Sequence, residues 1–250
     1  MDAELLDVFD SNAETYDRIN TVISLGLDRR WRDWAAREAV QRVGAKVLDA
    51  CAGTGLTGLR AAELGAEVTL ADASQGMLAV AGRRASAAGL RVSTVRADLG
   101  AAGDLAIPGG PFDAITMVFG ARYLQDPSAT IRSLATLLEP GGRFVLIDFV
   151  EPDDSPLART ASRYFFSVLP HIASWLAGRR DLYDRLVETT RAMGRREHLV
   201  SLMREADMEV VEVHKMGFGL VAGVIGRTPG PTAFIEESGE AYAGCGAGHS

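Results

Sequence analysis

Short apolar runs alternate with longer amphipathic segments through the middle of the chain, from about residue 44 to residue 150. The short runs are rich in residues that favour β-structure and end in polar or turn-forming residues, which is typical of strands. Strands that alternate with helices in this way predict a parallel sheet with crossover helices. The predicted strands cover residues 46–50, 67–72, 91–98, 112–119 and 143–150, and the predicted helices cover residues 56–64, 75–88 and 128–138.

Local signals mark where these helices begin and end. Ser74 is the expected N-cap of the second helix, and Pro127 opens the third. After the third helix the sequence EPGGR predicts a turn, because Pro140 stops a helix and the two glycines after it allow the chain to reverse.

Two further β-rich runs close the pattern. Residues 208–216 and 219–226 have only Gly217 and Phe218 between them, which predicts a hairpin. The expected fold is therefore α/β, with a seven-stranded, mostly parallel sheet that ends in a C-terminal antiparallel hairpin.

Two helical regions lie outside the predicted sheet, at residues 1–42 and at about residues 155–206. Both carry aromatic residues at mixed spacing, and a helical cap over the carboxyl edge of the sheet is the natural place for them. We therefore expect an N-terminal cap at 1–42 and a core at 43–228 that contains the second cap region as an insertion. Residues 229–250 are rich in Gly, Ala, Ser and Glu without periodicity, and we expect a mobile tail there.

Composition and charge exclude several classes of function. The 250 residues include 26 basic and 33 acidic side chains, and the net charge of −7 argues against a nucleic-acid partner. The longest apolar runs, such as residues 144–150, are far shorter than the roughly 20 residues of a membrane helix. The acidic N-terminus is unlike an export signal, and two cysteines, Cys51 and Cys245, are too few for a disulfide framework. We expect a soluble cytoplasmic protein.

A glycine-rich loop follows the first predicted strand. Gly53, Gly55 and Gly58 have the spacing G-x-G-x-x-G, which lets the backbone turn pass close to a ligand. By itself this pattern also fits a nicotinamide-dependent oxidoreductase, with Asp72 as the partner of the ribose.

Acidic residues near the strand ends favour a different ligand. Asp49, Asp72 and Asp98 fall near the ends of the first three strands, where ligands of open α/β sheets bind. Asp49 would repel a pyrophosphate but attract an ammonium group. S-adenosylmethionine carries an ammonium group and no pyrophosphate. The structural alternative is that each acid only caps the helix after its strand.

The predicted cofactor contacts follow from this charge pattern. We expect Asp49 and the loop backbone to face the methionine part of S-adenosylmethionine, and Asp72 to bind the ribose hydroxyls. Asp98 or the backbone of Leu99 would meet the adenine amino group. The loop residues in this set are Ala52, Gly53, Thr54 and Gly55.

Four segments in order, LDACAGTG, ADASQGML, FDAITMVFGARYLQD and LLEPGGRFVLIDF, resemble a class I S-adenosylmethionine-dependent methyltransferase. Residues 9–32 and 164–178 are similar to the ubiquinone and menaquinone biosynthesis C-methyltransferase family. The resemblance extends to about residue 226 and implies a Rossmann-like fold with a helical cap, and a homodimer. Methyl transfer from a sulfonium requires no metal, and we assign none, because His198, Cys245 and His249 lack partners at metal-ligand spacing.

The resemblance implies further site residues. Arg122 is expected to stabilise the phenolate of an aromatic acceptor, and its structural alternative is a surface arginine. Asp148, His171 and Tyr123 are the candidate proton acceptors, although His171 is also a candidate packing residue. The remaining expected residues are Tyr16, Ala73, Met77, Val118 and Phe119 at the cofactor, and Asn20, Tyr164 and Tyr183 at the acceptor.

Departures from the family pattern gather near the expected acceptor. Tyr123 stands where the family usually has asparagine, Val118 replaces a polar residue, and Asp148 replaces glutamate. We expect a methyltransferase acting on an aromatic, phenolic or quinol-like small molecule, with C-methylation favoured. The alternatives are an O- or N-methyltransferase of specialised metabolism, and a scaffold that keeps the cofactor for a non-transfer reaction such as cyclisation.

Overall fold

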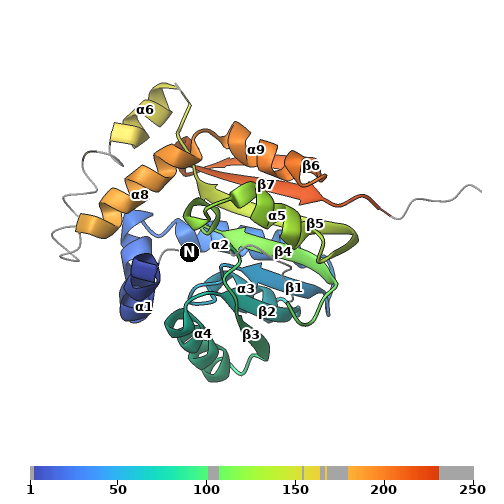
Figure 1. Cartoon of the computed structure of the whole chain (residues 1–250). Helices are drawn as coiled ribbons and strands as arrows, with labels where there is room; N and C mark the ends of the chain where they lie inside the picture. The colour runs from blue at the N-terminus through green and yellow to red at the C-terminus, as the bar shows by residue number, and fades with distance from the viewer. Residues whose placement is uncertain (1–2, 101–106, 154, 164–166, 168–179, 231–250) are drawn as a thin grey trace, which may run out of the picture.

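A twisted seven-stranded sheet forms the centre of the molecule (Figure 1). The computed structural model describes residues 3–100, 107–153, 155–163, 167 and 180–230. The strands are β1 (Lys46–Ala50), β2 (Glu67–Asp72), β3 (Val92–Arg96), β4 (Phe112–Val118), β5 (Leu138–Phe149), β6 (Glu209–Met216) and β7 (Val221–Arg227). Their order is β3-β2-β1-β4-β5-β7-β6, and β7 alone runs antiparallel to its neighbours. The predicted mostly parallel sheet with a C-terminal hairpin is confirmed.

Helices cover both faces of this sheet. On one face lie α2 (Asp28–Ala39), α3 (Leu56–Glu63) and α4 (Gln75–Ala87), and on the other lie α5 (Pro127–Ala135) and α9 (Arg196–Glu205). At the carboxyl edge lie α1 (Ala3–Ile23), which contacts α4, and α8 (Arg180–Met193), which contacts the short turn η1 (Ala121–Tyr123). The other elements are α6 (Pro156–Arg163) and the turn η3 (Gly217–Gly219). Within the part of the chain that the structure describes, no helix is long and apolar enough to cross a membrane.

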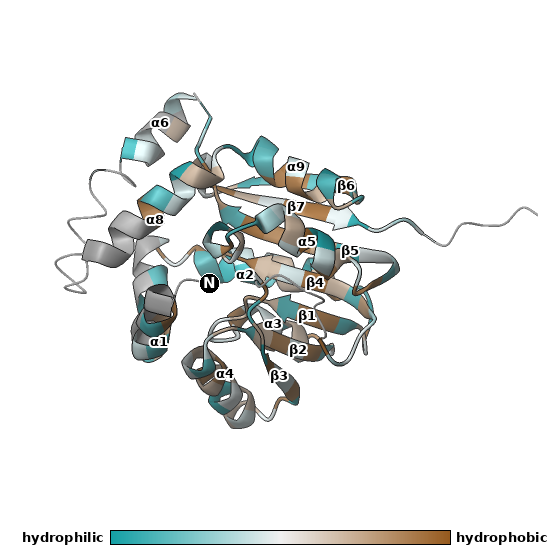
Figure 2. Cartoon of the chain, in the orientation of Figure 1, coloured by the Kyte–Doolittle hydropathy of each residue, from teal (hydrophilic) through white to brown (hydrophobic). Residues whose placement is uncertain are grey.

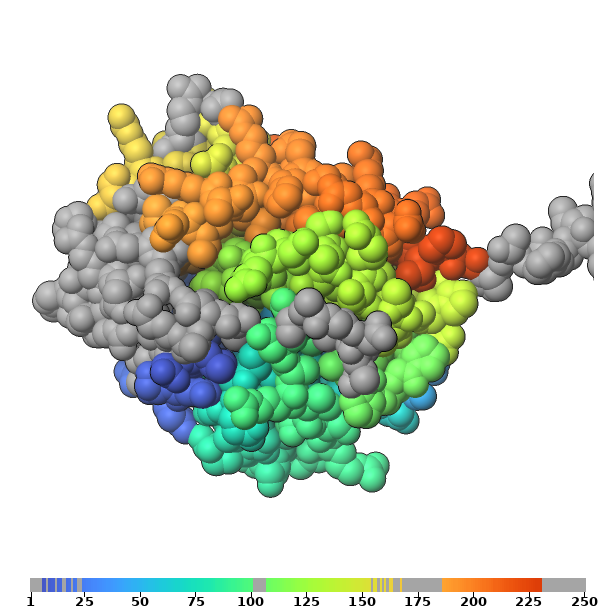
Figure 3. Space-filling model, in the orientation of Figure 1, coloured from blue at the N-terminus to red at the C-terminus, as the bar shows by residue number. Residues whose placement is uncertain are grey.

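Side chains that alternate along the strands form one hydrophobic core on each face of the sheet. Val47 and Val145 belong to the core under α2, α3 and α4, whereas Leu48 and Phe144 belong to the core under α5 and α9. Because side chains point to opposite faces at successive positions, one strand can supply both cores. Figure 2 shows these apolar strands between helices whose outer sides are more hydrophilic. In the space-filling view the green surface lies at the bottom, the yellow-green surface in the middle and the orange surface of residues after 185 at the top (Figure 3).

The N-terminal region divides between two positions. Helix α1 lies at the carboxyl edge, where a cap is expected, but α2 packs on a face of the sheet against β4 and β5. Three alanines of α2, Ala35, Ala36 and Ala39, are fully buried there. Their small side chains allow the helix to lie close to the strands.

The turn predicted at EPGGR is instead a bulge within β5. Helix α5 ends at Ala135, and β5 begins at Leu138, which pairs with Phe112. The next pair along is Ala114 with Arg143, so the β5 side carries the extra residues between two points of pairing. Phe112 N–H donates to the carbonyl of Leu137 at 2.8 Å, so the chain after α5 already pairs with β4 at this point. The expected helix end at residue 138 is therefore wrong.

Gly58 allows α3 to pack against β2. A Cβ at this position would lie 2.2 Å from Leu70 Cδ2 and 3.0 Å from Asp49 Oδ2, and both side chains are buried. We expect Gly58→Ala to lower the free energy of unfolding by about 2 kcal/mol, measured by urea denaturation. Gly82→Ala on α4 is the control, because nothing lies within 4 Å of a Cβ there. Equal stability of the two variants would contradict this role of Gly58.

Candidate active site

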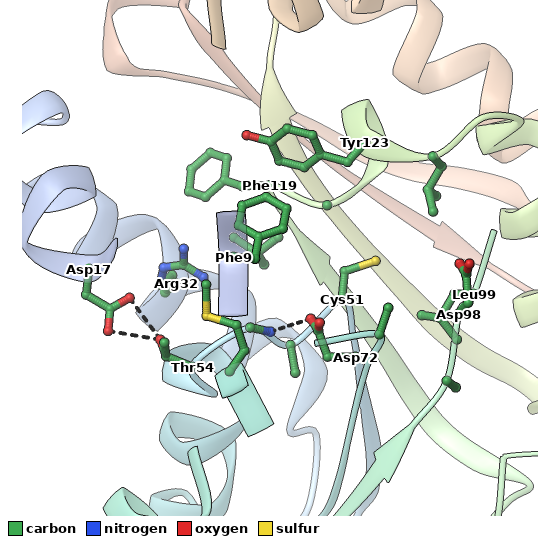
Figure 4. Close-up of a pocket in the computed structure, with 18 residues that line it drawn as sticks. Phe9, Asp17, Arg32, Cys51, Thr54, Asp72, Asp98, Leu99, Phe119 and Tyr123 are labelled. Carbon is green, nitrogen blue, oxygen red and sulfur yellow. Dashed lines mark hydrogen bonds between the residues drawn. The ribbon is translucent and has the colours of Figure 1, made fainter. Parts of the chain in front are cut away.

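A pocket opens at the carboxyl edge of the sheet, beside the loop that follows β1, with an empty volume of about 750 Å³ that is partly open to solvent. Its wall combines the ends of β2, β3 and β4 with side chains from α1 and α2 (Figure 4). The predicted cofactor residues that line it are Ala52, Gly53, Thr54, Asp72, Ala73, Met77, Asp98, Leu99, Val118 and Phe119. The strand-end pattern in the sequence therefore gathers at one cavity.

Glycines of the loop have separate roles. Gly53 has a φ of +54°, and nothing lies within 4 Å of a Cβ built on it, so the backbone leaves space at the pocket. Gly55 also has a left-handed φ of +80°, but its Cβ would lie 2.8 Å from the Cβ of Ala81. Gly53 thus keeps the pocket open, whereas Gly55 lets α3 and α4 approach each other. Gly55 does not line the pocket.

Asp72 presents its carboxylate at the floor of the pocket. One oxygen accepts a hydrogen bond from Gly53 N–H at 2.7 Å, and the other accepts from Ser74 N–H at 2.8 Å. Burial raises the pKa of Asp72, and these backbone donors oppose the rise. Each carboxylate oxygen can accept a second hydrogen bond, so the side chain retains the capacity to bind a diol from the pocket.

Asp49 lies behind the loop and does not line the pocket, contrary to the prediction that it faces a bound methionine group. Its oxygens accept from Gly58 N–H at 2.8 Å and from the Thr116 hydroxyl at 2.7 Å, and the side chain is buried. Because both oxygens point at protein donors, Asp49 joins the first turn of α3 to β4. This is the capping role that the sequence left as the alternative.

Burial raises the pKa of Asp49 to about 6. Between about pH 4 and pH 6 the Asp49 carboxyl is therefore protonated in the folded protein and ionised in the unfolded chain. The stability that this carboxyl contributes is fully present below about pH 4 and is lost as the pH rises through about 6. Asparagine can keep both hydrogen bonds without a charge. As the pH rises from 4 to 6.5, we expect the unfolding free energy of Asp49→Asn to increase by about 2 kcal/mol relative to that of the unaltered protein, measured by urea denaturation. A difference that stays constant with pH would contradict the raised pKa.

Aromatic side chains form the opposite wall of the pocket. The rings of Phe9 and Tyr123 meet edge to face with centroids 5.3 Å apart, and Phe119 lies next to them (Figure 4). Behind this wall Trp31 and Phe149 pack against Phe119, with centroids 6.0 Å and 4.9 Å from it. The pocket therefore has a polar side with carboxylates and an aromatic side.

Arg122 and Asp148, both expected to act on the acceptor, form a buried ion pair with each other. Their side chains are 3% and 0% exposed, and Arg122 Nη1 lies 2.5 Å from Asp148 Oδ1. The guanidinium also lies 4.6 Å from the ring centre of Tyr123 and 5.2 Å from that of Phe149. Neither partner lines the pocket. The structure thus corrects the sequence prediction: the pair supports the aromatic wall from behind.

The comparisons with known proteins agree with this geometry. Residues 1–227 match the model of the ubiE/COQ5 methyltransferase family. The chain belongs to this family. It is 36% identical over 215 residues to a demethylmenaquinone methyltransferase of Clavibacter sepedonicus, covering 86% of each chain. It is 35% identical to the demethylmenaquinone methyltransferase of Thermus thermophilus, covering 89% of this chain and all of that one.

Solved structures show the same fold at lower identity. A S-adenosylmethionine-dependent methyltransferase from Aquifex aeolicus superposes with a TM-score of 0.56 at 16% identity, covering 84% of this chain and 97% of that one. The magnesium protoporphyrin IX methyltransferase of Synechocystis, solved with its cofactor, gives 0.58 at 15% identity, covering 88% and 95%. The Rossmann-like methyltransferase fold is therefore confirmed.

S-adenosylmethionine is the methyl donor of this methyltransferase. The pocket fits it on structural grounds, since the open face of Gly53 leaves room for a ligand against the backbone and Asp72 offers carboxylate oxygens beside it. Asp98 and Leu99 stand on the far side of Asp72, where the adenine is predicted (Figure 4).

The cap contributes residues that the sequence reasoning did not select. Asp17 on α1 lines the pocket, and its carboxylate accepts from the Thr54 hydroxyl at 2.8 Å and from Arg84 at 2.6 Å. Arg32 on α2 and Cys51 line it as well, and burial raises the pKa of the Cys51 thiol. Asp17 and Arg32 both lie within residues 9–32, the segment that resembles the family's opening, so this resemblance was the available signal.

The other predicted cap residues remain predictions. Asn20 lies on α1 and is not among the described residues that line the pocket. Tyr16 lies on α1 and Tyr183 on α8, and the side chains of both are outside the part of the structure that is described. Tyr164 and His171 fall outside the described residues. Groups of three or more residues able to hold a metal are absent from the described part of the methyltransferase.

Proposed function

We propose that this methyltransferase transfers the methyl group to a ring carbon of a quinol-like aromatic compound. One observation carries the proposal: Phe9, Phe119 and Tyr123 form an aromatic wall that faces the carboxylates of the cofactor side within a single pocket. A planar ring can stack against such a wall while the polar side holds the donor. The names of the relatives, demethylmenaquinone methyltransferases among them, support a quinol ring as the acceptor.

The polar side of the pocket orients the donor. We assign the ribose hydroxyls to Asp72 and the adenine edge to Asp98 and Leu99. Asp17, which stands at the other end of the pocket, replaces Asp49 as the carboxylate nearest to the ammonium group. When bound, S-adenosylmethionine supplies a methyl group on a positively charged sulfur that is already activated for transfer. The protein therefore has to align the two partners and exclude water.

Tyr123 supplies the polar group of the aromatic wall. Its hydroxyl accepts a hydrogen bond from Arg122 Nη2 at 3.3 Å, which fixes the direction of the oxygen. Loss of the proton of a ring hydroxyl on the acceptor to solvent raises the electron density at the neighbouring ring carbon. This carbon forms a bond to the methyl group as the bond from the methyl group to sulfur breaks and S-adenosylhomocysteine leaves. The ring carbon then releases its proton to solvent, which restores the aromatic ring. We assign the contact with the ring hydroxyl to Tyr123, and its link to Arg122 places a positive charge behind the developing phenolate. Arg122 then acts as a positioning residue.

Labelled methyl transfer tests the acceptor class. The protein is incubated with S-adenosylmethionine that carries a CD₃ group and with a reduced demethylated naphthoquinone, and the product is analysed by mass spectrometry and NMR. We expect a CD₃ group on a ring carbon. A label on oxygen would favour the O-methyltransferase alternative. No labelled product from quinols, phenols or indoles would overturn the proposal.

Tyr123→Phe tests the proposed contact in the same assay. We expect transfer to slow by about tenfold to a hundredfold, because one hydrogen bond that forms with a developing charge is lost. Affinity for S-adenosylhomocysteine should stay within about threefold, since Tyr123 faces the acceptor side. Unchanged transfer would remove Tyr123 from the reaction.

We also propose that the enzyme works in the cytoplasm, as a homodimer and without a nucleic-acid partner. The net charge of −7 supports the last point, because a phosphate backbone requires clustered cations. The homodimer rests on the family resemblance.

A further inference from the structure

The charged side chains of the pocket are strongly unequal in sign. Among the described residues that line it, Asp17, Asp72 and Asp98 carry carboxylates, whereas Arg32 alone carries a cationic group. Arg32 projects from α2 toward the loop after β1, on the same side of the pocket as Asp17 (Figure 4). A ligand with both charges at one end would meet a partner of each sign there.

Among the described residues, no carboxylate forms a salt bridge with the guanidinium of Arg32, although its positive charge acts on the nearby buried carboxyl of Asp49 and lowers the pKa of that group. The contacts of the guanidinium are a hydrogen bond of 3.3 Å from Nη1 to the Thr57 hydroxyl and the ring face of Phe119, whose centre lies 5.2 Å from Cζ. Its Nε is buried and has no hydrogen-bond partner. A buried donor on a charged group is costly when it is left unpaired. This arrangement is therefore suited to an anion that arrives with the ligand.

The first turn of α3 already has an anionic acceptor inside the protein. The carboxylate of Asp49 accepts from Gly58 N–H at 2.8 Å, and neither Gly55 nor Thr57 lines the pocket. Among the described residues that line the pocket, Arg32 is therefore the one cationic group that a ligand anion can meet.

We propose that Arg32 binds the carboxylate of the methionine part of S-adenosylmethionine. Asp17 stands nearby for the ammonium group of the same amino acid, so the zwitterionic end of the donor meets both charges. The inference rests on S-adenosylmethionine as the methyl donor and is independent of the acceptor. Arg32 is thereby a binding residue that selects ligands with an intact amino-acid carboxylate.

Calorimetry with a matched pair of ligands tests this role. S-adenosylhomocysteine contains the carboxylate, and its decarboxylated analogue keeps the adenosine, the sulfur and the amine. We expect Arg32→Gln to lower the affinity for S-adenosylhomocysteine by about tenfold to a hundredfold, the usual range for a lost charge-assisted contact. The decarboxylated analogue should bind the variant and the unaltered protein within about threefold, and Arg32→Lys should restore part of the affinity for S-adenosylhomocysteine.

Arg29→Gln is the matched control. Arg29 lies on the same helix, is exposed and does not line the pocket, so its loss should leave both affinities unchanged. Thermal denaturation checks that all variants are folded. Equal losses for the two ligands, or no loss for either, would overturn the inference about Arg32. Failure of the unaltered protein to bind S-adenosylhomocysteine would overturn the assignment of the donor, and the inference with it.

Discussion

Asp72→Ala is expected to weaken the binding of S-adenosylhomocysteine by about a hundredfold or more. The carboxylate is the group that we assign to the two ribose hydroxyls, and each hydrogen bond to a charged acceptor contributes about 1.5–3 kcal/mol. The variant also leaves the N–H groups of Gly53 and Ser74 without their acceptor, which loosens the loop at the pocket. Isothermal titration calorimetry measures the loss directly.

Asp113→Ala provides the control for this measurement. Asp113 also lies on a strand of the sheet, but its carboxylate accepts from Arg42 and from Lys46 N–H, away from the pocket. We expect its affinity for S-adenosylhomocysteine to match that of the unaltered protein. If Asp72→Ala binds as tightly as Asp113→Ala, the assignment of the ribose to Asp72 is wrong.

Arg122→Met is expected to lower the free energy of unfolding by about 3–5 kcal/mol, because it leaves the buried charge of Asp148 without its partner. For a chain of this length such a loss corresponds to a fall in Tm of about 10 °C. Turnover should fall as well, since the aromatic wall loses its support. Thermal and urea denaturation give the stability of the variant.

A double variant separates the ion pair from other effects of the substitution. In Arg122→Met/Asp148→Leu neither charge remains, and replacing a buried pair by apolar groups is often close to neutral. We expect the double variant to recover most of the stability that Arg122→Met loses. A double variant less stable than Arg122→Met would show that the two residues do not stabilise the protein as a pair.

Local signals in the sequence identified most of the elements. Ser74 is the N-cap of α4, where its hydroxyl accepts from Met77 N–H, and α3 begins directly after the glycine loop. Such features depend on residues a few positions apart, so the sequence carries them completely. The end of α5 was mistaken because Leu138 already pairs with Phe112, a contact between distant segments that takes precedence over helical spacing.

The direction of charged side chains was harder to predict than their position. Asp49 lies at the strand end where an acid was expected, but Gly58 N–H and the Thr116 hydroxyl hold its carboxylate away from the pocket. The donor on Gly58 reaches Asp49 only once α3 has docked, and Thr116 comes from the neighbouring strand. Periodicity assigns a side chain to a face of the sheet, but it does not identify the group that the side chain meets.

The same limit applies to Arg122 and Asp148. They are 26 residues apart and meet because β4 and β5 are adjacent, with Val118 paired to Ile147. The resemblance drew attention to both residues, yet it assigned each of them separately to the acceptor. A pairing between them follows only from the register of the two strands.

A crystal structure of the protein with S-adenosylhomocysteine tests the central claim most directly. We predict the ribose hydroxyls on Asp72, the adenine beside Asp98 and Leu99, and the amino-acid carboxylate at Arg32. The sulfur should face the wall of Phe119 and Tyr123, because the methyl group must reach an acceptor stacked there. A ligand bound elsewhere, or one whose sulfur points away from this wall, would contradict the assignment of the pocket as the site of methyl transfer.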